Sequence, residues 1–187
     1  MTSTRSPRER LLHTAAELFY ERGTHLGIND LIDRSGVARM TLYNHFSSKE
    51  ALIEAALELR AERWRDWFRQ AVEDRTDDPA ERLLAAFDAL EERFHRPEFR
   101  GCAAINFAAE AADSDSTTHR IALAHKQKVR DYLTQLARNA DVNDPEALGR
   151  ELSLLLNGAT VMAQLTDDAA PAREAKSAAR VIVEAAI

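Results

Sequence analysis

The chain has 187 residues, of which 45% are hydrophobic and 30% are charged. This length suits one domain or two small domains that share a core, and the composition excludes a disordered or fibrous chain. No apolar run approaches the ~20 residues that a membrane-spanning helix needs, and the polar start of the chain does not resemble a signal peptide. The single cysteine, Cys102, excludes an intrachain disulfide. We therefore expect a protein of the reducing cytoplasm.

The charge is distributed unevenly along the chain. The net charge of −6 by itself argues against a nucleic-acid partner. Residues 1–49, however, hold seven Lys and Arg against five Asp and Glu, whereas residues 50–187 hold eighteen against twenty-six. The N-terminal quarter is thus the part of the chain that suits a phosphate backbone.

Apolar residues recur at spacings of three and four almost throughout, which predicts an all-α protein of about nine helices. Residues that cap free N–H groups indicate four of the helix starts, and these are Ser6, Ser47-Ser48, Asp78 and Asp144. The predicted helices cover residues 7–22, 28–35, 39–46, 48–74, 79–95, 98–112, 116–139, 145–165 and 171–187.

Two of these helices, 28–35 and 39–46, are short and are joined by a turn at Gly36. Glycine tolerates the positive φ that a tight turn needs, and Val37 is expected to fill the corner between the helices. Leu42 and Phe46 are four residues apart, so they share the buried face of the second helix. Two short helices joined in this way form a helix-turn-helix unit, whose second helix enters the major groove of DNA.

The opposite face of helix 39–46 carries side chains that a core does not need. Asn pairs with adenine, Arg pairs with guanine, and Met or Thr contacts a thymine methyl group. Tyr, His and Lys hold phosphates and fix the position of the helix, and a lysine in the first turn of the next helix lies where N–H groups attract phosphate. A partly buried Tyr43, an ordinary surface His45 and a phosphate contact by Arg39 remain alternatives. The predicted DNA-binding residues are Arg39, Met40, Thr41, Tyr43, Asn44, His45 and Lys49.

Residues 8–60 resemble the N-terminal domain of the TetR family of bacterial transcriptional regulators. The resemblance rests on residues 15–23 (AAELFYERG), 36–39 (GVAR), 41–46 (TLYNHF) and 48–52 (SKEAL). It implies a homodimer with two DNA-binding heads and a divergent C-terminal domain, in which a small molecule releases the protein from DNA. We accordingly expect a helix-turn-helix domain over residues 1–47 and an effector-binding and dimerisation domain over residues 48–187.

The resemblance also implies a division of roles in the helix-turn-helix. Thr41, Tyr43, His45 and Lys49 match positions that contact the DNA backbone, and Arg39, Met40 and Asn44 match positions that face bases. The chain departs from the family at Gly27, where Thr or Ser usually caps the helix and touches a phosphate. Ala38 likewise replaces a common Ser.

Two stretches of the C-terminal part are candidates for a small-molecule site. An aromatic stripe at spacings of three and four, residues 64–68, is either core or the wall of a pocket. Residues 99–110 are nearly all small or apolar and resemble, more loosely, one subset of TetR-like regulators. Two polar residues there lie one turn apart, as in a mostly apolar ligand cavity, although Asn106 bridging helices is the alternative. We expect a small, mostly apolar effector held by Trp64, Trp67, Phe68, Phe87, Cys102, Asn106, Phe107 and Glu110.

The last two predicted helices are apolar over more than one face. Such helices are buried both in their own domain and against a partner, and two from each chain would form a four-helix bundle. A purely intrachain core is the alternative. The predicted dimer interface comprises Leu152, Leu155, Leu156, Ala159, Ala179 and Ile182.

The sequence predicts neither a cofactor nor a metal site. The spacing of His95, His119 and His125 is not a ligand pattern, and a lone cysteine is more often a small hydrophobe than a redox sensor. No nucleophile–base pair, metal-ligand spacing or phosphate-binding loop supports an enzyme that uses Glu110 with a histidine. The polar face of helix 39–46 counts against a pure dimerisation scaffold. We therefore expect a homodimeric transcriptional repressor, released from a palindromic operator by a small-molecule effector, and not an enzyme.

Overall fold

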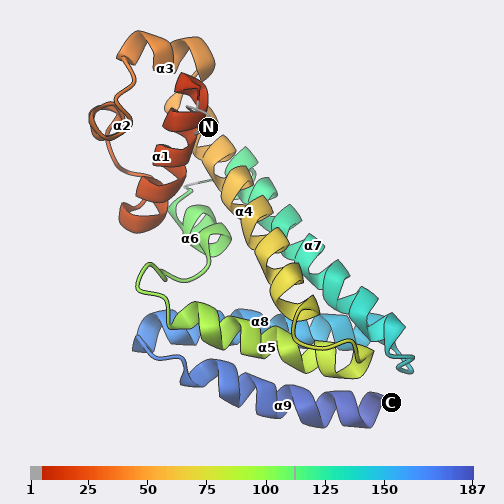
Figure 1. The fold of residues 1–187 in the computed structure, drawn as a ribbon. Coiled ribbons are helices and arrows are strands. Elements are labelled where there is room, and N and C mark those ends of the chain that lie inside the picture. The colour runs from red at the N-terminus through yellow and green to blue at the C-terminus, as the bar shows by residue number, and fades with distance from the viewer. Residues whose placement is uncertain (1–5, 112) are drawn as a thin grey trace, which may run out of the picture. The chain divides into compact units, whose positions relative to one another are not determined.

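The computed structural model describes residues 6–111 and 113–187, and Figure 1 shows the fold. Regular secondary structure within these residues is entirely helical, which confirms the predicted all-α class. No described helix is long and apolar enough to cross a membrane. The described helices are α1 (Pro7–Arg22), α2 (Ile28–Ser35), α3 (Arg39–His45), α4 (Lys49–Glu73), α5 (Pro79–Phe94), α6 (Ala103–Glu110), α7 (Thr117–Asn139), α8 (Pro145–Thr166) and α9 (Ala170–Ala186).

Side-chain caps hold the helix starts that the sequence marks. The Ser6 hydroxyl accepts from the Glu9 N–H at 3.2 Å, and Asp144 accepts from the Ala147 N–H at 2.9 Å. Asp78 accepts from two N–H groups in the first turn of α5. At α4 the cap is Ser48, which accepts from the Ala51 N–H at 3.1 Å, so this helix begins one residue later than predicted.

The start of α6 corrects the sequence prediction. A helix over residues 98–112 was expected, but α6 covers Ala103–Glu110, and the predicted end at Ala112 lies outside the described residues. Gly101 has φ +76°, in the left-handed region, which interrupts a helix at this point. The Arg100 guanidinium donates to the carbonyl of Phe99 at 2.7 Å and so occupies an oxygen that a longer helix would use. Cys102, which the predicted helix would contain, therefore precedes α6.

The chain divides into two compact units. The head comprises the described residues up to Glu62 together with Ala103–Leu123, and the C-terminal unit comprises Arg63–Cys102 and Ala124–Ile187. The head therefore contains α6 as well as the helix-turn-helix, and α4 and α7 contribute to both units. The expected functional boundary between residues 47 and 48 stays a prediction.

In the head, α1 packs against α2 and α3. Fully buried leucines from α1, α2, α3 and α4 form its core, and α6 adds Phe107, which meets Phe19 of α1 edge to face with ring centroids 6.4 Å apart. These contacts hold two helices of only eight and seven residues, which would be marginal alone.

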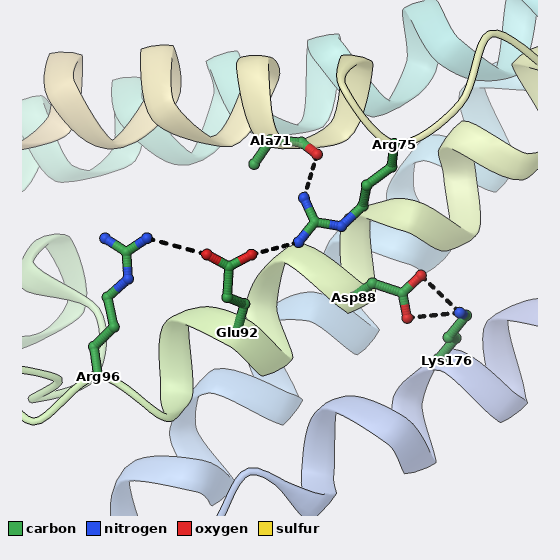
Figure 2. A network of polar contacts seen from close by, with 6 residues as sticks. All are labelled: Ala71, Arg75, Asp88, Glu92, Arg96 and Lys176. Atoms are coloured by element: carbon green, nitrogen blue, oxygen red, sulfur yellow. Dashed lines mark hydrogen bonds and ion pairs between the residues drawn. The ribbon is translucent and has the colours of Figure 1, made fainter.

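In the C-terminal unit, α5, α8 and α9 pack side by side (Figure 1). Many buried alanines on these helices permit close approach, and Gly149 lies against the backbone of Thr134 on α7. Figure 2 shows polar contacts that fasten the outside of this packing. Glu92 of α5 bonds Arg75 at 2.6 Å, and Lys176 of α9 bonds Asp88 of α5 at 2.6 Å. Such partly exposed ion pairs contribute little stability individually, so burial of the apolar core provides most of the stability of this unit.

Candidate nucleic-acid interface and effector region

The turn of the helix-turn-helix has the geometry that the sequence predicts. Gly36 has φ 64° and ψ 26°, and its N–H donates to the carbonyl of Ile32 at 3.0 Å. The buried Ser35 hydroxyl accepts from the N–H of Val37 at 3.3 Å, and Val37 itself is buried between the helices. The turn is thus fixed by its own backbone and by one side chain.

The α3 helix has one buried and one exposed face. Leu42 is fully buried and the adjoining Phe46 is 5% exposed, which confirms both as core residues. Outward, Met40 is 73% and Tyr43 47% exposed. Arg39, Asn44 and His45 are also exposed, whereas Thr41 is half-buried. The helix therefore presents a polar face containing two exposed apolar side chains, which is the arrangement that reading DNA requires.

Arg39 has a partner that sequence reasoning missed. Its guanidinium donates to the side-chain oxygen of Asn29 near the start of α2. This bond crosses the turn between residues ten apart, so no local spacing pattern indicates it. In the free chain this hydrogen bond holds the Arg39 side chain against α2, and a contact of Arg39 with a base stays a prediction.

Two arginines brace the recognition helix and the head. The guanidinium of Arg8 lies 5.3 Å from the ring centre of Phe46, directly after α3. Arg60 of α4 donates to the carbonyl of Ala16 at 3.2 Å and lies 3.7 Å from the ring centre of Tyr20. Cation–π contacts of this kind attach the middle of α4 to α1, and the segment that follows α3 to α1.

The starts of α4 and α2 differ in the side chains that they carry. Lys49 is the first residue of α4 and is half-buried. The neighbouring Glu50 carboxyl accepts hydrogen bonds from the backbone N–H of Glu50 and from the Ser48 hydroxyl, and these bonds lower its pKa. At α2, the Gly27 N–H donates to Asp30 at 3.2 Å, but Gly27 supplies no hydroxyl, as the sequence implies.

The predicted aromatic stripe belongs to the C-terminal unit. Trp64 stacks on Phe68 with ring centroids 4.6 Å apart, and both Phe68 and Phe87 are 1% exposed within the core. The indole of Trp67 instead has two cations near its ring, Arg93 at 5.6 Å and Arg96 at 5.4 Å. These contacts are those of core and surface packing, and a role in effector binding stays a prediction.

The other predicted effector residues lie elsewhere in the structure. Cys102 is half-buried in the C-terminal unit, whereas Asn106, Phe107 and Glu110 belong to the head. Glu110 accepts hydrogen bonds from both the N–H and the hydroxyl of Thr24, at 2.5 and 2.6 Å. Thr24, in the loop after α1, is a second partner that sequence reasoning missed. The C-terminal end of α6 is thereby tied to the loop that leads into α2.

The predicted interface residues differ in exposure. Leu152, Leu156, Ala159 and Ala179 are at most 5% exposed within the single chain and belong to its core, so their role in an interface stays a prediction. Leu155 and Ile182 are half-buried. The exposed apolar residues on the same two helices are Leu154, Val161, Met162, Leu165 and Val181. An interface on α8 and α9 stays a prediction, with this second set as its contacts.

One buried histidine lies beside the aromatic stripe. His125 is 5% exposed, its ring meets Trp64 edge to face at 5.4 Å, and its Nδ1 lies 3.2 Å from the Arg65 guanidinium. Burial first, and then nearby cations led by Lys126, lower its pKa to about 3. In residues 6–111 and 113–187, no three His, Cys, Asp or Glu side chains gather as metal ligands.

Comparison with known proteins identifies the family. Residues 11–56 match the model for bacterial regulatory proteins of the TetR family, and residues 79–179 match the tetracycline repressor-like C-terminal domain. This chain therefore belongs to the TetR family and is a helix-turn-helix, DNA-binding transcriptional regulator. Similar proteins are likewise named as transcriptional regulators.

Three similar proteins illustrate this membership. The crystal structure of a TetR-family transcriptional regulator from Streptomyces coelicolor is 32% identical in sequence and has a TM-score of 0.87. The match covers 96% of this chain and 95% of the Streptomyces chain. The transcriptional regulator YjdC of Escherichia coli is 26% identical over 81% of this chain and 80% of YjdC. The transcriptional activator FasR of Mycolicibacterium smegmatis is 41% identical over 44% of this chain but only 38% of FasR.

Proposed function

We propose that this chain is a homodimeric repressor that binds a palindromic operator and is released by a small-molecule effector. The observation that carries the DNA-binding part is the exposed outer face of α3, held from below by Leu42 and Phe46. On this proposal Tyr43, His45 and Lys49 hold the DNA backbone, and Arg39, Met40 and Asn44 face the bases. Two heads of one dimer would read half-sites ~34 Å apart, or a multiple of that distance.

The exposed apolar face of α8 and α9 supports the homodimer. Leu154 and Leu165 are 72% and 74% exposed, and Val181 is 67% exposed. Large apolar side chains that recur on one face of neighbouring helices indicate a surface that associates. Two copies of this face would pack about a twofold axis as a four-helix arrangement.

The attachment of α6 supports effector release through the head. Glu110 and Phe107 tie α6 to α1 and to the loop before α2. A displacement of α6 would therefore move the helix-turn-helix, and an effector that favours the displaced state would lower DNA affinity by its differential affinity for the two states.

Fluorescence anisotropy with DNA from the chain's own promoter region tests the proposal. We expect preference for this DNA over a scrambled duplex, with affinity falling steeply between about 50 and 200 mM salt. Lys49→Gln should reduce the slope of log K against log salt by about 1, whereas Arg138→Gln, an exposed α7 variant with the same charge change, should leave it unchanged. A dimer without salt-sensitive sequence preference would refute the proposal.

The direction of regulation has a separate test. In a reporter strain that carries the promoter, deletion of the regulator should raise expression if it is a repressor. A fall in expression on deletion would show an activator, as the name of the similar protein FasR states for that protein.

A further inference from the structure

A cavity of about 430 Å³ lies among α4, α5 and α7 within the C-terminal unit. Its volume falls in the range of small-molecule pockets, ~300–1,000 Å³. The residues that line it are all different from the eight effector-binding residues predicted from the sequence. It is therefore a separate candidate site, which the sequence did not predict.

Positive charge predominates on the wall of this cavity. Four cationic side chains line it against two carboxylates, although the whole chain has a net charge of −6. The excess of cations is thus local and favours an anionic occupant. The charged residues of the wall are Arg65, Arg69, Glu73, Arg82, Lys128 and Asp131.

Two of the four cations are available to a ligand. Arg82 is engaged, because its Nε donates to the carbonyl of Thr76 at 2.8 Å. Arg65 lies beside His125. Arg69 and Lys128, by contrast, take part in none of the ion pairs formed among the described residues, and both are exposed. They are the natural partners for a carboxylate.

Tyr132 adds an aromatic surface to the wall. Its hydroxyl is buried and has no hydrogen-bond partner among the described residues. Burial, and secondly the Glu73 carboxylate, raise its pKa to about 12, so the hydroxyl remains protonated. A buried donor without an acceptor is unfavourable. The flexible Arg69 lies 5.5 Å from the ring centre, so its movement toward a ligand would uncover the ring.

We propose that this cavity binds a small carboxylic acid with an apolar body. The carboxylate would lie between Arg69 and Lys128, and the body would pack on the Tyr132 ring and on Leu136. Inorganic phosphate would leave most of the volume and this apolar surface unused. The assignment names an effector class and rests on the proposed regulatory function for its biological role, although binding itself can be measured without DNA.

The chain contains its own reporter for this site. Trp64 stacks on Phe68 at 4.6 Å, and Phe68 meets Tyr132 edge to face at 6.0 Å. The chain has two tryptophans, Trp64 and Trp67, and both lie in this stretch of α4. Repacking around Tyr132 should therefore change the tryptophan emission.

Benzoate titrations of the full chain test the proposal, with benzamide as the uncharged control of equal shape. At constant ionic strength, millimolar benzoate should change tryptophan emission and raise the melting temperature, and benzamide and inorganic phosphate should do neither. Arg69→Gln and Lys128→Gln should each raise the benzoate Kd about tenfold. Tyr132→Phe keeps the ring on which the ligand body packs, so it should leave the Kd nearly unchanged. Arg150→Gln, on α8, should leave it unchanged.

Three results would overturn the site: no response to benzoate, equal binding of benzamide, or benzoate binding that Arg69→Gln and Lys128→Gln leave unchanged. Phosphate binding with the same dependence on these variants would overturn the apolar part of the assignment. DNA anisotropy then separates the two proposals. If benzoate binds but DNA affinity is unaffected, the effector role of the site is wrong, whereas a chain that binds no DNA refutes the proposed function and leaves the benzoate result standing.

Discussion

The head and the C-terminal unit use buried space differently. In the head, short helices are held by single large side chains such as Leu42 and Phe19, and the polar groups of α3 face outward. The C-terminal unit buries polar chemistry, with His125 and the Tyr132 hydroxyl inside and cations around a cavity. The exposed face of α3 is formed by residues at helical spacing within one short segment, so the sequence shows it. The cavity is formed by residues from several helices, so no local sequence pattern indicates it.

The largest expected effect comes from truncating a buried leucine in the core of either unit. Leu42→Ala, in the head, and Leu133→Ala, in the C-terminal unit, each remove a side chain with no exposed area, so each should lower the free energy of unfolding by about 2–5 kcal/mol in urea. At a temperature where both variants remain folded, Leu42→Ala should abolish DNA binding, whereas Leu133→Ala should retain it. Equal loss of DNA binding in both variants would mean that the head depends on the core of the C-terminal unit as well as on its own.

Low pH should destabilise the C-terminal unit through its buried histidine, His125. His125 has a pKa of about 3 in the folded chain and about 6.5 unfolded, so the unfolded state binds the proton more tightly. Stability should therefore be lost as pH falls below about 6.5, by up to about 2 kcal/mol at pH 5. His125→Gln should flatten this dependence, whereas the exposed His45→Gln should not. An unchanged pH profile in His125→Gln would contradict the assignment.

The α6 contact should behave as a coupled pair. Glu110→Gln and Thr24→Val each weaken the bonds between α6 and the loop after α1, and a double-mutant cycle on urea unfolding should give a coupling free energy of about 1 kcal/mol. This value lies below the usual range for a charge-assisted bond, about 1.5–3 kcal/mol, because Glu110 is exposed. Additive effects of the two substitutions would show that the contact does not hold α6 to the head.

The smallest expected effects compare two glycines of the head. Gly36 has φ +64°, so Gly36→Ala should cost roughly 1–2 kcal/mol of stability despite open space around it. Gly27 has φ −72°, which any residue adopts, so Gly27→Ser should add a few tenths of a kcal/mol by capping α2. The new hydroxyl should also tighten DNA binding about two- to tenfold by restoring a phosphate contact. Unfolding and anisotropy measurements check both, and weaker DNA binding by Gly27→Ser would contradict this interpretation.

Local chemistry made much of the fold predictable. The caps at Ser6, Asp78 and Asp144 fix helix starts because each satisfies N–H groups within three residues. The late start of α6 was missed because its apolar spacing continues through Gly101, whose left-handed conformation depends on the folded surroundings.

The candidate sites were predictable to unequal extents. Leu42 and Phe46 follow from helical spacing alone, so the outer face of α3 follows too. On α8 and α9, spacing could not show which apolar stripe faces the chain's own core, and Leu152 is buried where Leu154 is exposed. The Arg39–Asn29 and Glu110–Thr24 bonds, and the cationic cavity, arise from tertiary contacts between distant residues.

The most direct test of the central claim, that the exposed face of α3 reads DNA, compares Asn44→Ala with the unmodified chain on a panel of single-base-pair operator variants. We predict a loss of preference at one base pair in each half-site, worth about 1–3 kcal/mol, with the salt dependence and the urea unfolding curve unchanged. Uniform weakening on all operators, or no change on any of them, would contradict the claim that Asn44 faces a base.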